Sequence, residues 1–399
     1  MSQGRAGGMP PAVSPARPGD LAGRAAGDYA AAYGRPAEGV WFAPGRVNLI
    51  GEHTDYNGGL VLPFALGTGV AVAAGRQGDE ITVWSRQRGG TLVSAPGSGL
   101  VPGSVSGWAA YPLGMAWALA AAGHRPAGTA IAIDSDLPIG AGLSSSAALE
   151  CAVGLALADL HDLAVTRPEL VAAASRAENE FAGAPTGIMD QSAALLCQAG
   201  HALLLDCRSG ATEEVRLDPG ADGLALAVID TGTRHALNDG RYAARRRSCE
   251  EAARALGVPS LRDLTGRPEA VAGLADPELR RRARHVVTEN RRVLAAAGLL
   301  RRGDLAAVGS LLTASHASLR DDFEVSWPQA DAAVGAALAA GAAGARMTGG
   351  GFGGSVIALV RDERLPAVTA AVTAAFARAG WQPPGVMKVT PSPAGRRLR

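Results

Sequence analysis

A strand pattern, a glycine-hinged loop and a small-residue helix pattern follow one another in residues 128–160. Residues 128–136 alternate apolar and polar side chains like a half-buried strand, and residues 147–160 are rich in alanine and leucine at helical spacing. The loop between them reads PIGAGLSSSAA. Free amides of a first helical turn can hold an anion, and the serines add donors or a metal ligand. The segment predicts a phosphate-binding loop, although a serine-rich helix cap after a tight turn explains it about equally well.

The phosphate loop lacks the cation that the common nucleotide-binding designs require. Lys388 is the only lysine in the chain. A Walker-type P-loop needs a lysine after its second glycine, and protein kinases need a strand lysine paired with a helix glutamate. Both designs are therefore excluded. Cationic help for a nucleotide would have to come from arginine, magnesium or backbone dipoles.

The length of 399 residues is more than one ordinary core needs, so two domains are expected. A polar stretch at 208–223 contains proline and glycine, which predicts domains at 21–220 and 221–399. Residues 1–20 have no apolar signal segment and are expected to form a disordered tail. Strand patterns between 40 and 86 are followed by helical patterns without a regular βαβ repeat, so the expected fold class is α+β.

Further helical and strand patterns follow along the chain. Helical patterns cover 108–122, 147–160, 167–181, 240–256, 276–297, 304–318, 327–340 and 365–379. Strand patterns cover 201–206, 224–230, 355–360 and 386–390.

Composition excludes several classes of partner. The net charge is +1, with no basic excess of the kind that a nucleic-acid site needs, so no nucleic-acid partner is expected. No apolar run reaches the length of a membrane span, so no membrane partner is expected either. The four cysteines form no C-x-x-C pair, which favours reduced thiols in a cytoplasmic protein.

A short glycine-bounded loop at 43–59, the sugar loop hereafter, gathers arginine, glutamate, histidine, aspartate and asparagine. A site for a ligand with many hydroxyls needs this mixture, because carboxylates accept hydrogen bonds from several of them. A metal site from Glu52, His53 and Asp55 is a weaker alternative, since the spacing differs from the helical H-E-x-x-H. An ordinary polar turn is the remaining alternative.

Two further segments carry candidate chemistry. Asp190 lies in the sequence APTGIMDQS, where it is either a helix cap or a poorly solvated carboxylate that can orient a hydroxyl or take its proton. Glu178, twelve positions upstream, reads by itself as an ordinary surface glutamate. Residues 346–355 hold five glycines around one phenylalanine, which would let the backbone approach a ligand or let the loop move.

Read together and in this order, the three segments resemble the GHMP kinases and, within them, the galactokinase family. The sequence GRVNLIGEHTDYN at 45–57 is similar to the galactokinase signature. It is the specific part, because mevalonate, homoserine and related kinases share the two glycine motifs. The resemblance extends from about residue 40 to about residue 360.

The resemblance implies a two-lobed α+β GHMP kinase fold. A ribosomal-protein-S5-like N-terminal lobe would carry the sugar and phosphate loops, a ferredoxin-like lobe would follow, and the active site would lie between them. The implied activity is ATP-dependent phosphorylation of the C1 hydroxyl of α-D-galactose to galactose 1-phosphate and ADP, the first step of galactose use. The expected partners are galactose, ATP and Mg²⁺, and a monomer is expected.

The same resemblance implies roles for individual residues. Asp190 and Arg46 would be catalytic, with Asp190 as the base. The implied sugar contacts are Glu52, His53, Thr54, Asp55, Gly187, Asp190 and Tyr242. The implied ATP contacts are Gly140, Ala141, Gly142, Leu143, Ser144, Ser145 and Ser146, with Ser85 and Trp108 suggested for the adenine. The implied magnesium ligands are Ser146 and Glu178.

Two alternatives stay open. A sister 1-kinase acting on N-acetylgalactosamine, galacturonate or arabinose would keep the phosphate motifs and change the sugar loop. A catalytically silent galactose sensor would use the same pocket to regulate a partner protein. The intact Glu52, His53, Thr54 and Asp55 favour galactose, and the presence of Asp190 argues against the sensor.

Overall fold

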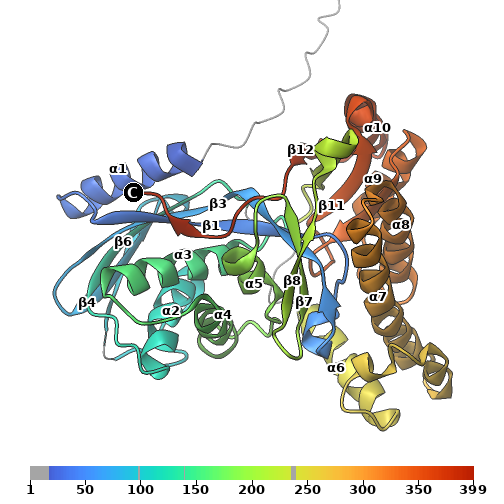
Figure 1. Cartoon of the computed structure of the whole chain (residues 1–399). Helices are drawn as coiled ribbons and strands as arrows, with labels where there is room; N and C mark the ends of the chain where they lie inside the picture. Colours follow the sequence, from blue (N-terminus) through green and yellow to red (C-terminus); the bar gives the residue numbers. More distant parts are fainter. Residues whose placement is uncertain (1–17, 98, 139, 235–239) are drawn as a thin grey trace, which may run out of the picture.

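The structure is a computed structural model that describes residues 18–97, 99–138, 140–234 and 240–399. Within them the main strands form three sheets, and helices pack on these in two lobes (Figure 1). The strands are β1 (Gly39–Asn48), β2 (Leu60–Val61), β3 (Pro63–Arg76), β4 (Glu80–Ser85), β5 (Thr91–Pro96), β6 (Thr129–Ser135), β7 (His201–Asp206), β8 (Thr212–Arg216), β9 (Leu224–Asp230), β10 (Gly344–Thr348), β11 (Ser355–Arg361), β12 (Gly385–Val389) and β13 (Arg396–Arg397). The α-helices are α1 (Pro18–Tyr33), α2 (Ala110–Ala121), α3 (Ser145–Leu160), α4 (Arg167–Arg176), α5 (Met189–Leu196), α6 (Arg241–Ala255), α7 (Pro277–Arg301), α8 (Leu305–Asp321), α9 (Pro328–Ala339) and α10 (Leu365–Arg378).

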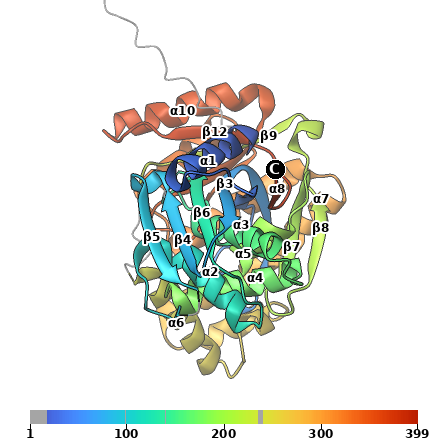
Figure 2. The same cartoon turned by 90° about the vertical axis from the view of Figure 1, so that its left-hand side faces the viewer.

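The N-terminal lobe is built on the six-stranded sheet β13-β1-β3-β6-β4-β5. Alternate residues of β1 point to opposite faces of this sheet. Trp41 and Ala43 enter the large core that α2 and α3 cover, whereas Val40 and Phe42 pack with α1. The sheet therefore lies between α1 on one face and the helices α2 to α5 on the other (Figures 1 and 2).

The C-terminal lobe is built on the antiparallel sheet β10-β11-β9-β12. Helices α8 and α9 pack against β10, and α10 packs on α9. The small sheet β2-β7-β8 borders α7, so this helix of the C-terminal lobe lies beside strands that adjoin the sugar loop (Figure 1).

The strand–loop–helix unit that the sequence predicts is confirmed as β6 followed by α3. The helix predicted at 167–181 is instead α4 followed by a π-helical turn, Ala177–Phe181. Such single turns are rare and often lie at functional sites. No helix of the described residues is long and apolar enough to cross a membrane.

The two ends of the chain differ from the expected domain arrangement. Helix α1 begins at Pro18, so the last three residues of the tail predicted at 1–20 are helical; the remaining seventeen lie outside the described residues. Proline favours a first helical position, which the composition-based prediction overlooked. Strand β13 pairs with β1, with Arg397 opposite Trp41. The last residues of the chain therefore join the N-terminal sheet.

Candidate active site

A cavity between the two lobes, the central cavity hereafter, collects the loops that the sequence singles out. Its wall combines the sugar loop, the phosphate loop, the segment around Asp190 and the loop at 349–354 between β10 and β11, the glycine-rich loop hereafter. The lining residues are Arg46, Glu52, His53, Asp55, Pro138, Gly140, Ala141, Gly142, Leu143, Ser144, Ser145, Ser146, Glu178, Ala184, Pro185, Thr186, Gly187, Met189, Asp190, Tyr242, Gly349, Gly350, Gly351 and Phe352.

Arg46 and Asp190 form a bidentate ion pair on the cavity wall. Nε of Arg46 donates to Oδ1 of Asp190 at 2.8 Å, and Nη2 donates to Oδ2 at 2.9 Å. Arg46 also donates to the carbonyl oxygen of Gly142 at 2.7 Å, and the hydroxyl of Ser144 donates to Asp190 at 2.5 Å. An arginine fork fixes the plane of a carboxylate. Asp190 is therefore oriented, and it is tied directly to the phosphate loop.

The phosphate loop has a backbone that leaves the start of α3 open. Gly140 and Gly142 both have φ of 74°, and Ser144 has φ of 59°, so all three lie in the left-handed region. Ser144 precedes α3 without a side-chain cap on its amides. The first-turn amides of a long helix thus border the cavity, where the helix dipole favours an anion.

Glu178 lies in the π-helical turn and points to the start of α3. Its carboxylate accepts hydrogen bonds from Ser146 at 2.8 Å, Thr186 at 2.8 Å and Gln191 at 2.6 Å. Burial raises the pKa of Glu178, and the charge of Asp190 adds to the effect. The reading of Glu178 as an ordinary surface glutamate is wrong, because the carboxylate is buried on the cavity wall.

Asp55 and Gly187 lie against each other on the wall of the central cavity. A Cβ added to Gly187 would lie 2.0 Å from Oδ2 of Asp55, so only glycine fits beside this carboxylate. Burial raises the pKa of Asp55 to about 6, and the charges of Asp190 and Glu52 add to the effect. A carboxylate held this way gains from hydroxyl donors that replace the water it has lost.

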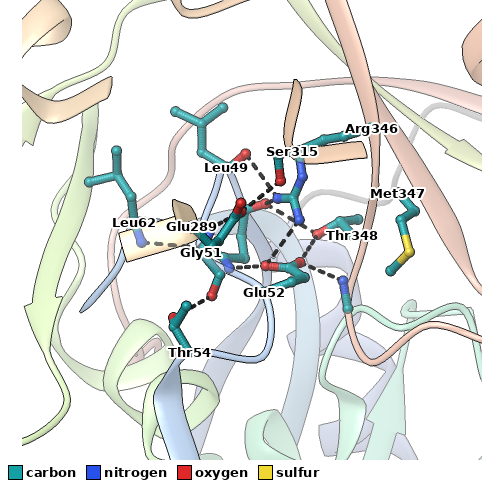
Figure 3. Close-up of polar contacts among 12 residues, drawn as sticks. Leu49, Gly51, Glu52, Thr54, Leu62, Glu289, Ser315, Arg346, Met347 and Thr348 are labelled. Atoms are coloured by element: carbon teal, nitrogen blue, oxygen red, sulfur yellow. Dashed lines mark hydrogen bonds and ion pairs between the residues drawn. The ribbon is translucent and has the colours of Figure 1, made fainter. Parts of the chain in front are cut away.

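Glu52 is fastened by residues of both lobes (Figure 3). Oε1 accepts hydrogen bonds from the hydroxyl of Thr348 at 3.0 Å and from the amide of Gly349 at 2.7 Å. Oε2 lies 3.3 Å from the Arg346 guanidinium and accepts a hydrogen bond from Asn48. Glu52 lines the cavity, and its carboxylate also links the sugar loop to the glycine-rich loop.

His53 and Tyr242 form an aromatic wall. Their ring centroids are 5.4 Å apart, and Tyr56 lies 5.4 Å from Tyr242. Nδ1 of His53 is 2.8 Å from the Tyr56 hydroxyl, whereas its Nε2 is buried without a protein partner. Burial lowers the pKa of His53 to about 3, so the ring is neutral near pH 7. His53 lines the cavity, although its Nε2 has almost no exposed surface.

Several predicted residues do not line the central cavity. The Thr54 hydroxyl is fully buried and lies 2.8 Å and 2.7 Å from the carbonyl oxygens of Gly51 and Leu60. The hydroxyl therefore stabilises the turn, and a contact of Thr54 with the sugar stays a prediction. Ser85 and Trp108 are also absent from the wall, and their contact with an adenine stays a prediction.

The alternative metal site from Glu52, His53 and Asp55 finds no support. Among the described residues, no group of three or more His, Cys, Asp or Glu side chains is arranged to hold a metal ion.

The sequence analysis missed residues that hold the predicted ones. Arg346 and Thr348 precede the glycine-rich loop and bind Glu52, while Thr186 and Gln191 hold Glu178. Thr186 and Gln191 lie in the APTGIMDQS segment, so their closeness in sequence to Asp190 was the signal that could have identified them as residues of the site.

Three family models match consecutive parts of the chain. The galactokinase galactose-binding signature matches residues 27–76, the GHMP kinase N-terminal domain matches 110–198, and the GHMP kinase C-terminal domain matches 296–378. The first of these covers the sugar loop, and the second covers the phosphate loop and Asp190.

Curated relatives and solved structures agree with these models. The galactokinase of Streptomyces coelicolor is 49% identical over 370 residues, covering 92% of this chain and 96% of that protein. The galactokinase of Mycobacterium tuberculosis is 46% identical, covering 90% and 98%. The crystal structure of Lactococcus lactis galactokinase with galactose has a TM-score of 0.89 at 33% identity, covering 94% and 99%. Methanococcus jannaschii mevalonate kinase, at 18% identity and a TM-score of 0.64, shares the fold.

Proposed function

Since the chain belongs to the galactokinases of the GHMP kinase family, we propose that its central cavity transfers the γ-phosphoryl group of ATP to the C1 hydroxyl of α-D-galactose. The observation that carries the proposal is the junction at Asp190, where one carboxylate contacts Arg46 and the phosphate-loop Ser144. The sugar loop borders one side of this junction and the start of α3 borders the other.

Asp190 is the proposed catalytic residue. It accepts the proton of the C1 hydroxyl as the hydroxyl oxygen bonds to the γ-phosphorus and the bond from that phosphorus to the β–γ bridging oxygen breaks, releasing ADP. A loose transition state needs little activation of the nucleophile, so orientation of the hydroxyl is the larger part of the role. Arg46 holds the Asp190 carboxylate in place and adds positive charge near the transferring group.

The residues around Ser146 fit a magnesium ion. Its hydroxyl lies 2.8 Å from Oε1 of Glu178, and both residues line the cavity beside the phosphate loop. One hydroxyl and one carboxylate match Mg²⁺, which usually takes one or two protein oxygens and completes its shell with phosphates and water. When bound with ATP, the ion would neutralise charge on the triphosphate. Ser146 and Glu178 are the proposed ligands.

The sugar would be held from several directions. Asp55 offers a carboxylate, His53 offers an unpartnered Nε2, and Tyr242 offers a ring on the cavity wall. Glu52 lines the same wall. Gly187 leaves room for the Asp55 carboxylate, so its contribution is space rather than a contact.

Three broader expectations remain part of the proposal. A lobe division near 220/221 is kept, with the last residues of the chain returned to the N-terminal sheet by β13. Cytoplasmic location is supported by Cys151, Cys197 and Cys249, which are free and buried in the pattern of proteins from reducing compartments. A monomer and adenine contacts from Ser85 and Trp108 stay predictions.

A coupled ADP-release assay across five sugars tests the proposed function. Galactose should give turnover well above N-acetylgalactosamine, galacturonate, arabinose and glucose, because the sugar loop carries the full galactokinase set of polar residues. A preference for one of the other sugars would favour the sister-kinase alternative. Turnover on none of them would favour the sensor.

A further inference from the structure

The sugar loop belongs to the N-terminal lobe, but its backbone is held by helix α7 of the C-terminal lobe. The amide of Gly51 donates to Oε1 of Glu289 at 3.1 Å. The amide of Leu60, which directly follows the loop, donates to Oδ1 of Asn290 at 2.7 Å. His285 places its Nε2 3.1 Å from the carbonyl oxygen of Glu52. Burial lowers the pKa of His285 to about 4, so near pH 7 the neutral ring can donate there from Nε2.

The contact between α7 and the sugar loop is close enough to require glycine. A Cβ on Gly51 would lie 2.9 Å from a methyl carbon of Val293, and a Cβ on Gly59 would lie 2.6 Å from Oδ1 of Asn290. The loop backbone therefore rests directly on the helix. The hydrogen bonds from side chains of α7 go to peptide groups of this segment.

Glu289 is the centre of this contact (Figure 3). It is fully buried, and besides the Gly51 amide it accepts hydrogen bonds from Ser315 at 2.6 Å and Arg292 at 2.6 Å. The charge of Arg292 and other nearby cations lower the pKa of Glu289 to about 2 despite its burial. The carboxylate is thus a charged acceptor locked in one position by α7 and α8.

Glu289 does not line the central cavity. Glu52 does, and it directly follows Gly51, whose amide donates to Glu289. Arg346 supports the same stretch by donating to the carbonyl oxygens of Asn48 and Leu49 at 3.1 Å each. The peptide that presents Glu52 is therefore fixed from behind. A freer loop would spend less time in the binding-competent conformation, and the apparent affinity would fall in proportion.

We infer that Glu289 is a positioning residue that sets the affinity for galactose without touching the sugar, by holding the Gly51–Glu52 peptide against the C-terminal lobe. The inference rests on the proposed function. It predicts a selective effect, because the hydrogen bonds of Glu289 go to Gly51, Arg292 and Ser315, and none joins it to the described residues of the phosphate loop or to the start of α3.

Two substitutions of Glu289 by side chains of similar size test its role as a hydrogen-bond acceptor separately from its role in packing. Glu289→Met removes both oxygens, and should weaken galactose binding about tenfold while leaving the Kd of ADP within about twofold. Glu289→Gln keeps one oxygen for the Gly51 amide and Ser315, and should stay within about threefold of the parent for galactose. The measurement is isothermal titration of the full chain with galactose and with Mg·ADP. Val287→Ala, a buried core change on the same helix, is the control for general destabilisation.

The outcomes decide the inference. An unchanged galactose Kd in folded Glu289→Met overturns it, and so does an equal loss of galactose binding in Val287→Ala. If Glu289→Met fails to fold, Ser315→Ala removes one donor from Glu289, and should weaken galactose binding about threefold. An unchanged Kd in that variant also overturns the inference. Failure of the parent protein to bind galactose at all would instead contradict the proposed function.

Discussion

Asp55 and Gly187 are packed so closely that a side chain added at Gly187 would displace the Asp55 carboxylate. A Cβ on Gly187 would lie 2.0 Å from the Asp55 carboxylate oxygen, far inside van der Waals contact. Gly187→Ala should therefore displace Asp55 and raise the KM for galactose about tenfold or more, with a much smaller change in the KM for ATP. Steady-state kinetics with each substrate varied in turn measures this split.

The matched control for that change is Gly266→Ala, since a Cβ at Gly266 meets nothing within 4 Å. It should leave both KM values unaltered. A normal galactose KM in Gly187→Ala would contradict the assignment of Asp55 to the sugar.

The raised pKa of Asp55 makes galactose binding pH-dependent. With a pKa of about 6, Asp55 is mostly protonated at pH 5 and mostly ionised at pH 7. If the sugar hydroxyls donate to the carboxylate, the Kd for galactose should fall by about tenfold from pH 5 to pH 7. Stability of the free protein changes in the opposite direction: since the pKa of Asp55 is raised on folding, its contribution is present below about pH 4 and is lost as the pH rises through 6.

Titration calorimetry at several pH values measures this binding effect. His53, with a pKa of about 3, stays neutral over the whole range and does not add to it. Asp55→Asn should give a flat profile. A flat profile in the parent protein would show that the charge of Asp55 does not take part in binding.

The sequence could predict the cavity residues because their motifs are local. Arg46, Glu52 and Asp55 come from one short loop, and that loop lines the cavity. The sequence could not separate Thr54 from its neighbours, because the direction of a side chain in a turn depends on the backbone: the Thr54 hydroxyl reaches carbonyl oxygens of the turn instead of the cavity.

The N-termini of helices α3 and α4 differ in how their first-turn amides are capped, and this difference indicates which helix binds a ligand and which supports the fold. Helix α4 has a complete capping box, in which Thr166 accepts from the Glu169 amide and Glu169 accepts from the Thr166 amide. Helix α3 has no side-chain cap at Ser144, and its start borders the cavity. Amides that a cap would occupy in a structural helix are thus left for a ligand.

Loss of the α4 cap should affect stability alone. Thr166→Ala should lower the free energy of unfolding by about 1 kcal/mol and the melting temperature by about 2–4 °C, because the Glu169 amide loses its acceptor and the Glu169 carboxylate loses the hydroxyl donor. Thr166→Ser, which keeps the hydroxyl, should change little. Calorimetry beside steady-state kinetics tests this, and a loss of activity in Thr166→Ala would mean that α4 has a role beyond supporting the fold.

Among the helices and strands, the periodicity of apolar residues predicted β6 and α3 but missed the π-helical turn. The patterns at 128–136 and 147–160 correspond to β6 and α3. The π-helical turn at Ala177–Phe181 is a single turn of five residues, which is too short to give a periodic signature of its own. That turn holds Glu178, so the element that the pattern missed carries a residue of the site.

The whole molecule joins segments that lie far apart in the sequence. Arg346 contacts Glu52, Glu289 contacts Gly51, and β13 pairs with β1. No local motif encodes these long-range contacts, which explains why the two lobes were predicted but their connections were not. The sugar loop is consequently a shared structure, with one lobe supplying its chain and the other supplying its support.

The central claim at this scale is that Asp190, on the wall of a cavity that both lobes line, accepts the galactose proton. The most direct measurement compares Asp190→Asn with the parent protein, using ADP release for turnover and calorimetry for galactose binding. Asparagine keeps the shape but not the basic carboxylate, so turnover should fall by about a thousandfold or more while galactose binding stays detectable. Near-normal turnover in Asp190→Asn would contradict the account.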